Sequence, residues 1–183
     1  MEQRELINII IKRGWSIFPC GLDKKPLTRQ GFKNATKDKA RIIAWGEEHP
    51  NFKIGIPCAD NYFFAVDIDP EGIKTWNKWV REYGSAGKGP KQHTPRGGLH
   101  ALYKLPVGLP VPNTAGKLAE GVDLRSNGYI CTGDGYTWET GENSVSAQLS
   151  DAPAWLLDKI RAYVESRKEP ESTKAVSFTP ADP

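Results

Sequence analysis

One hydrophobic run, YFFAVDID at residues 62–69, constrains the fold more than any other part of the chain. It is rich in aromatic and β-branched residues, and two turn-forming residues, Asn61 and Pro70, bound it. Such a run predicts a β-strand that is buried in a hydrophobic core. Because side chains alternate between the two faces of a strand, Val66 and Ile68 would face that core.

The other face of this strand would carry two carboxylates. Asp67 and Asp69 stand two positions apart in the run, so their side chains would lie roughly 6–7 Å apart on one face. Two like charges at this spacing repel each other, and a divalent cation such as Mg²⁺ or Mn²⁺ would relieve the repulsion. The Asp-x-Asp-Pro pattern also suits carboxylates that cap a turn or the start of a helix. The run alone leaves both interpretations open.

Other segments supply partners for this strand. Further strands are expected at residues 15–19, 53–57, 91–95, 99–106, 120–125, 129–133 and 136–139. Amphipathic helices are expected at residues 5–13, 37–48, 73–83 and 152–167. Thr36 would cap the second helix, and its residues Ile42, Ile43 and Trp45 would face inward. A first half that mixes strands and helices, followed by hairpins, predicts an α+β fold with a mostly antiparallel sheet.

Length and composition predict one folded domain with a tail. The chain has 183 residues, of which 38% are hydrophobic, enough to build a substantial core. We expect the domain over residues 1–167 and a polar, Pro-rich linker over residues 168–183, leading toward a further C-terminal region. The start of the chain does not resemble a signal peptide, and no apolar stretch is long enough to cross a bilayer. These features predict a soluble protein that is intracellular or lies inside a virion.

Two further segments alternate polar and apolar residues in the same manner. In EGVDLR, residues 120–125, Asp123 and Arg125 would share one face of a strand. In GGLHALYK, residues 97–104, His100 would lie on the face opposite its apolar neighbours. His100 taken alone also suits an ordinary hydrogen-bonded strand histidine. Three strands that each combine an apolar face with acidic, basic or histidine side chains favour one shared functional surface.

The turn before His100 adds groups that suit phosphate. Arg96 offers a planar donor for phosphate oxygens, while Gly97 and Gly98 permit close approach of the backbone. Asp123 would add a third carboxylate, which a two-metal nucleotidyl-transfer site requires.

These motifs together resemble the bifunctional primase–polymerase (prim-pol) domain of the archaeo-eukaryotic primase superfamily, in particular the type at the N-terminus of plasmid and phage replication proteins. Asp67 and Asp69 match the family's first motif, Asp-x-Asp. Gly98 and His100 match the second, a small residue two positions before a histidine, and Asp123 matches the third. Many relatives carry Ser or Thr where this chain has Gly98, so a backbone amide would replace the hydroxyl as a phosphate contact. The likeness covers roughly residues 5–160.

The resemblance implies a fold and a chemistry. The fold would be an RRM-like, mostly antiparallel catalytic sheet with flanking helices, plus an N-terminal α/β subdomain. Asp67, Asp69 and Asp123 would hold two Mg²⁺ or Mn²⁺ ions. His100 would contact the phosphates of the incoming nucleotide, with a further contact from Arg125. The reaction would be attack of a 3′-hydroxyl on the α-phosphate, with release of pyrophosphate.

The resemblance also implies partners. These would be a single-stranded DNA template, a primer, a dNTP or NTP, and a helicase or helical domain that follows in the full-length protein. The setting would be the cytoplasm of a bacterial or archaeal host. Two groups of loop cations would contact nucleic acid, or would only be solvated: Lys24, Lys25, Arg29, Lys88 and Lys91.

Two alternative functions fit the same residues. A metal-dependent nuclease would use the same carboxylates, and would degrade a strand without added nucleotides. A non-catalytic module that binds single-stranded DNA would use the acids structurally, and would be indifferent to metal. The histidine beside Gly97 and Gly98 favours triphosphate binding over the nuclease.

Overall fold

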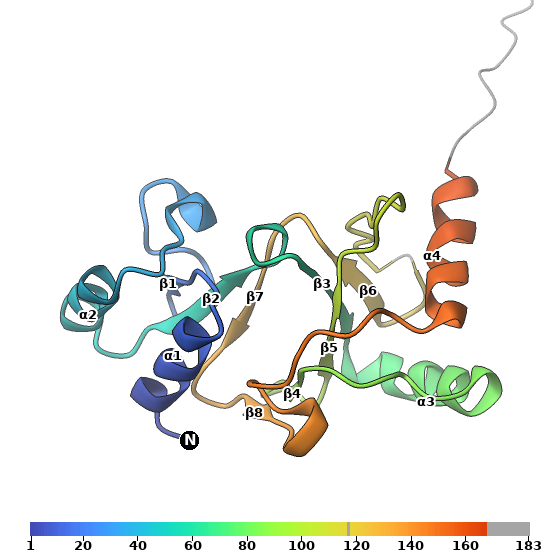
Figure 1. Cartoon of the computed structure of the whole chain (residues 1–183), viewed down its shortest axis with the longest axis horizontal. Helices are drawn as coiled ribbons and strands as arrows, with labels where there is room; N and C mark the ends of the chain where they lie inside the picture. The colour runs from blue at the N-terminus through green and yellow to red at the C-terminus, as the bar shows by residue number, and fades with distance from the viewer. Residues whose placement is uncertain (117, 168–183) are drawn as a thin grey trace, which may run out of the picture.

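Two antiparallel sheets organise the chain, and the five-stranded one carries most of the motif residues (Figure 1). The computed structural model describes residues 1–116 and 118–167. The five-stranded sheet has the order β6-β3-β5-β4-β8. Its strands are β3 (Phe63–Ile68), β4 (Lys91–His93), β5 (Leu99–Lys104), β6 (Val122–Arg125) and β8 (Thr137–Trp138). The expected α+β fold with antiparallel sheets is confirmed.

The smaller sheet belongs to the N-terminal part of the molecule. Its order is β1-β2-β7, with β1 (Phe18–Cys20), β2 (Lys53–Pro57) and β7 (Tyr129–Thr132). Helices α1 (Gln3–Lys12) and α2 (Lys39–Glu48) lie on this side of the molecule in Figure 1. Strand β7 comes late in the sequence, so the chain returns to the first sheet after building most of the second.

Helices α3 (Ile73–Tyr83) and α4 (Ala154–Glu165) cover one face of the five-stranded sheet. They bury the apolar residues of β3, including Phe64, Val66 and Ile68, in one core cluster with Trp76 and Leu156. The strand order β6-β3-β5-β4, with α3 after β3, is the expected RRM-like arrangement. The second helix on this face, α4, follows the whole sheet in the chain.

The opposite face of β3 is divided. Phe63 and Ala65 are fully buried in a second core cluster, which includes Ile54 and Ile56 of β2. Asp67 stands next along this face, just past the residues that the smaller sheet covers. The contact between the two sheets thus ends where the carboxylates begin.

Some expected boundaries were wrong. The first strand begins at Phe18, and Ile17 instead forms an isolated bridge with Thr36. Thr36 does not cap helix α2 as expected: the helix begins at Lys39 because Asp38 caps it, accepting a hydrogen bond from the Ala40 amide at 2.9 Å.

The inward orientation expected for Ile43 was wrong as well. Its side chain is 61% exposed, whereas Ile42 and Trp45 are buried. Ile42 and Trp45 stand three positions apart and so share a helix face, and Ile43 lies outside it.

None of the helices in residues 1–116 and 118–167 combines the length and apolar character needed to cross a membrane. The linker expected over residues 168–183 lies outside the described residues.

Candidate active site

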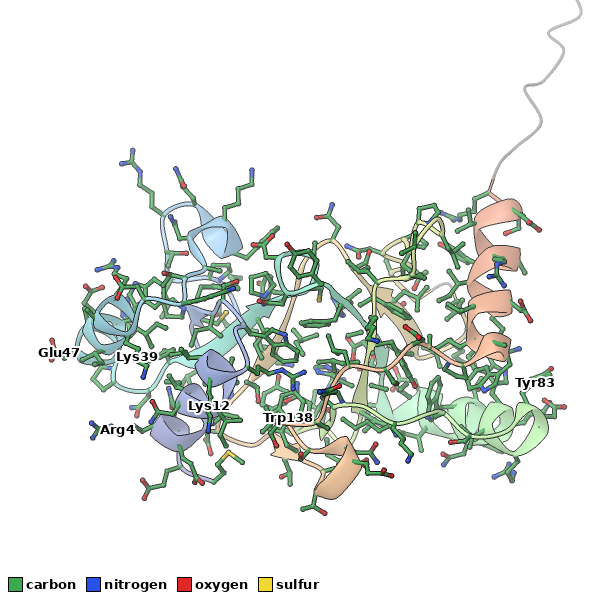
Figure 2. All side chains as sticks on the ribbon, in the orientation of Figure 1. Arg4, Lys12, Lys39, Glu47, Tyr83 and Trp138 are labelled. Carbon is green, nitrogen blue, oxygen red and sulfur yellow. The ribbon has the colours of Figure 1, made fainter. Side chains whose placement is uncertain are left out.

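Strand pairing aligns five side chains in one row across the large sheet. Asp67 on β3 is the direct partner of Asp123 on β6 and of His100 on β5. His100 is in turn the partner of Gln92 on β4, and Gln92 is the partner of Trp138 on β8. Figure 2 labels Trp138 at one end of this row. The three motifs of the sequence therefore meet on the face that α3 and α4 leave uncovered.

Asp67 occupies the centre of the row, held by two basic side chains. Its Oδ1 lies 3.1 Å from His100 Nε2, and its Oδ2 accepts a hydrogen bond from Arg125 Nε at 2.6 Å. Burial alone would raise the pKa of Asp67, but the contacts with His100 and Arg125 outweigh it and hold the pKa well below its usual range. Asp67 is therefore a permanent carboxylate at neutral pH.

Asp69 follows the end of β3 and has the opposite surroundings. Burial and the neighbouring carboxylates Asp67, Glu71 and Asp123 raise its pKa, which Arg96 only partly offsets. The Asp69 amide donates to the Gly121 carbonyl at 2.9 Å, which fixes this end of β3 beside the start of β6. Crowding by like charge is the condition that a divalent cation would relieve.

The three carboxylates fit a divalent cation by donor type, since hard oxygen ligands suit Mg²⁺ and Mn²⁺. Among residues 1–116 and 118–167, however, no three His, Cys, Asp or Glu side chains converge on one point. Asp67 turns toward His100 and Arg125. Asp123 accepts hydrogen bonds from Thr114 Oγ1 at 3.2 Å and from the Gly116 amide. A shared ion would require these contacts to rearrange.

Gln92 completes the support of His100, and the sequence motifs did not identify it. It is fully buried, and its Nε2 lies 2.8 Å from both His100 Nδ1 and the carbonyl oxygen of Cys131 on β7. Its Oε1 has no hydrogen-bond partner within the described part of the chain. Flipping the amide would set Oε1 against the Cys131 carbonyl, so Nε2 must donate to Nδ1. The proton of neutral His100 then sits on Nε2, facing Asp67.

The glycines of the turn before β5 have structural roles in this conformation. The Gly97 amide donates a hydrogen bond to the Thr94 carbonyl oxygen, and the Gly98 amide donates one to Thr94 Oγ1, each at 3.0 Å. Neither amide is therefore free to bind phosphate in this conformation. A Cβ on Gly98 would collide with the Ile68 carbonyl oxygen. Gly98 is required because β3 and this turn approach closely beside Asp69. Arg96 is exposed and close enough to influence Asp69.

The loop cations divide into two groups. Lys24 approaches the site, with its Nζ 5.9 Å from the ring centre of Tyr136, and Tyr136 lies 6.2 Å from the His100 ring. Lys25 stands next to Lys24 and pairs with Asp23 at 3.2 Å. Lys53 on β2, which the motifs also missed, places its Nζ 5.4 Å from the same Tyr136 ring.

The remaining cations lie elsewhere. Arg29 lines a groove beside α2 with Trp45. Lys88 pairs with Glu142 at 2.6 Å. Lys91 is the strand partner of Ala101, so it lies on the face opposite His100.

The comparison with known families agrees with this arrangement. The family model for the N-terminal domain of bifunctional DNA primase/polymerase matches residues 9–155, which is most of the chain and includes all three motifs. No curated protein matches the chain. The chain belongs to the family of bifunctional DNA primase/polymerase N-terminal domains.

Proposed function

We propose that this domain extends a DNA strand by template-directed nucleotidyl transfer. The 3′-hydroxyl of the primer loses its proton to solvent, and its oxygen forms a bond to the α-phosphorus of the incoming nucleotide. The bond between the α-phosphorus and the oxygen that bridges it to the β-phosphate breaks, releasing pyrophosphate. The observation that carries the proposal is the row in which Asp123, Asp67 and His100 are direct strand partners. Family membership supports primase or polymerase activity.

Enzymes of this family are generally metal-dependent. In our proposal Asp67, Asp69 and Asp123 hold two Mg²⁺ or Mn²⁺ ions, which when bound would neutralise charge on the phosphates and on the attacking oxygen. Asp67 is ionised in advance, because His100 and Arg125 keep its pKa low. Arg125 must release Asp67 Oδ2 for that oxygen to bind an ion.

The basic side chains around Asp67 position the triphosphate. Because Gln92 occupies Nδ1, the proton of neutral His100 lies on Nε2, where it faces Asp67 Oδ1 in this structure. Once Asp67 turns toward the ions, this proton becomes a suitable donor to a phosphate oxygen. Arg125 and Arg96 flank the carboxylates and supply charge-assisted donors. Catalysis then rests on positioning and charge neutralisation, as in other phosphoryl transfers.

The proposed biological setting is plasmid or phage replication, with a single-stranded template, a primer and a following helicase or helical domain as partners. Lys25 and Arg29 remain predicted contacts to nucleic acid. Lys88 and Lys91 lie away from the row, so the proposal does not include them.

Primer extension tests the proposal directly. A labelled primer on a template would be incubated with Mg²⁺ or Mn²⁺ and either dNTPs or NTPs, using the wild type, Asp67→Asn and a control, Asp60→Asn. Asp60 is exposed beyond the other end of β3, so its variant should extend normally. We expect Asp67→Asn to lose at least about 10²-fold, a usual cost of removing one electrostatic stabiliser. Equal extension by wild type and Asp67→Asn would contradict the site.

The same assay separates the alternatives. A nuclease would shorten the labelled strand without added nucleotides, and Asp67→Asn would stop it. A binding module would retain template affinity in EDTA and would incorporate no nucleotide.

A further inference from the structure

A cluster of positive charge surrounds the ring of Tyr136, on the far side of His100 from the carboxylates. Lys24 lies in the loop that follows β1, and Lys53 begins β2, so one is next to the smaller sheet and the other is part of it. Their ammonium groups lie 5.9 and 5.4 Å from the Tyr136 ring centre. The His100 ring lies 6.2 Å from that ring, so the cluster adjoins the row of strand partners.

Neither of the two ammonium groups has an acidic partner in the described part of the chain. Within residues 1–116 and 118–167, no carboxylate lies at ion-pair distance from Lys24 or Lys53. The neighbouring Lys25, by contrast, pairs with Asp23. Lys53 Nζ is held at 2.9 Å by the carbonyl oxygen of Asp134. Two cations gathered around one ring with no anion indicate a seat for an anionic ligand.

The backbone of Lys24 adds an independent observation. Lys24 has φ of +67°, a left-handed conformation that side chains other than glycine and asparagine rarely adopt. Its carbonyl oxygen accepts a hydrogen bond from the Tyr129 hydroxyl at 3.0 Å, which holds the loop against β7. A glycine would fit this backbone at lower cost, so a lysine at this point carries a cost in backbone strain.

The position of the cluster determines which part of a nucleotide it would meet. Across the large sheet, the acids lie on β6 and β3, His100 lies on β5, and Tyr136 immediately precedes the outer strand β8. A triphosphate with its α-phosphate at the carboxylates would reach the two lysines if its terminal phosphates lie beyond His100.

We propose that Lys24, Lys53 and Tyr136 form the seat for the β- and γ-phosphates of the incoming nucleoside triphosphate. This inference rests on the proposed function. It assigns Lys24 a contact with the incoming nucleotide, whereas the sequence analysis expected Lys24 to contact nucleic acid. The bound triphosphate would bridge the two sheets. Tyr136 keeps its proton, since burial and nearby negative charge raise its pKa, and its hydroxyl would act as a donor.

Binding measurements without DNA test the seat apart from the reaction. Calorimetry would compare dATP, dAMP and inorganic tripolyphosphate, with the wild type and the Lys24→Gln/Lys53→Gln double variant. We expect the double variant to lose about tenfold or more in affinity for dATP and tripolyphosphate, as removal of charge-assisted contacts to phosphate would. The affinity for dAMP should not change, because dAMP lacks the terminal phosphates.

A charge-matched control removes non-specific effects. Lys12→Gln/Lys88→Gln lowers the net charge by the same amount at two exposed positions away from the site. This control should bind dATP as the wild type does. Primer–template affinity should be the same in all three proteins, and equal dATP affinity in the seat variant and the control would overturn the proposal.

Failure of the seat and failure of the proposed function give different results. If the wild type extends primers but the seat variant keeps its KM for dNTPs, the function stands and the seat is refuted. If the wild type does not extend primers but the seat variant loses dATP binding selectively, the seat stands and the function is refuted. Loss of primer–template affinity in the seat variant with unchanged dATP binding would show that the lysines hold DNA.

Discussion

The acidic and basic ends of the candidate site are built in different ways. The carboxylates Asp67 and Asp123 sit on adjacent strands of one sheet and are direct partners in its register. The lysines Lys24 and Lys53 reach the site from the other sheet, one from a loop and one from the start of β2. The acidic end is fixed by strand pairing, while the basic end depends on how the two sheets meet. We therefore expect substitutions at the acidic end to abolish nucleotidyl transfer, and substitutions at the basic end to weaken nucleotide binding.

The largest effect is expected at the acidic end, from Asp69→Asn. Loss of this carboxylate should lower kcat about 10²–10³-fold, if Asp69 helps to hold the ions. The same change should raise thermal stability, because the raised pKa of Asp69 shows that its folded surroundings disfavour the charged form. Primer extension and a thermal melt measure the two quantities.

Glu71→Gln is the matched control for Asp69. Glu71 is exposed and adds to the repulsion at Asp69, but our proposal does not make it a ligand. Its variant should gain a little stability and keep its activity. An Asp69→Asn protein that is less stable than the wild type would contradict the crowding that we infer from charge.

Gly98→Ala tests whether the acidic end depends on close backbone approach. The new methyl group would meet the Ile68 carbonyl oxygen, so we expect a loss of about 1–3 kcal/mol in the free energy of unfolding. Gly46→Ala in α2 is the control, since a Cβ there meets no atom within 4 Å. The helical control should be stabilised by about 0.5–1 kcal/mol. Denaturant unfolding measures both, and a neutral Gly98→Ala would show that the turn can withdraw from β3.

Gln92→Leu tests the junction between the two ends. The variant removes the donor to His100 Nδ1, so the imidazole is no longer held with its proton on Nε2. We expect kcat/KM for dNTPs to fall about tenfold, the scale of one hydrogen bond to a charged ligand. The ¹⁵N chemical shifts of His100 should show a changed tautomer population.

Thr132→Val is the control for this junction. Thr132 is also fully buried and accepts a hydrogen bond from Trp138 Nε1 at 3.0 Å, but has no bond to His100. Its variant should change stability without altering the His100 shifts. Equal shifts in wild type and Gln92→Leu would exclude the positioning role.

The smallest effect is a difference in pH dependence between the two aspartates. Asp67 has a lowered pKa, so its contribution to stability is complete above its unfolded pKa of about 3.9 and is lost as the pH falls further. Asp69 has a raised pKa, so the folded state gains relative stability as the pH falls toward 3.9.

Thermal melts between pH 3 and 7 measure this difference. The melting temperature of Asp67→Asn should lie below that of the wild type, and this difference should shrink by a few degrees on acidification. The size follows from about 2–4 °C per kcal/mol for a chain of this size. The higher melting temperature expected for Asp69→Asn should also approach that of the wild type on acidification, but at higher pH than the change seen for Asp67→Asn. Parallel curves for the two variants would contradict the opposite environments described above.

The acidic end was accessible from the sequence, whereas Lys24 was the only residue of the basic end that the sequence analysis named. Alternation along residues 62–69 placed Asp67 on the uncovered face, and the structure brings it together with His100 and Asp123 as the motifs suggest. Lys53 and Tyr136 carry no local signal, because their proximity depends on the packing of one sheet against the other.

Gln92 is an intermediate case. Its place opposite His100 follows from the short hairpin of β4 and β5, so the turn at residues 94–98 contained that information. Its bond to the Cys131 carbonyl joins the two sheets and could not be predicted. Ile43 shows that a helix pattern can also predict burial that does not occur, because this apolar residue lies beside the buried face and stays exposed.

The row of strand partners makes assembly of the site an all-or-none event. A slip of one residue between β3 and β5 would send His100 to the face covered by helices and would bring an apolar neighbour beside Asp67. No half-built site can arise in this way, since the misplaced register also exposes the core. A single residue inserted within β3 or β5, unless absorbed by a β-bulge, would therefore separate His100 from Asp67 and turn apolar core residues outward. Added length is tolerated best in connections that, unlike the turn at residues 94–98, do not pack against β3.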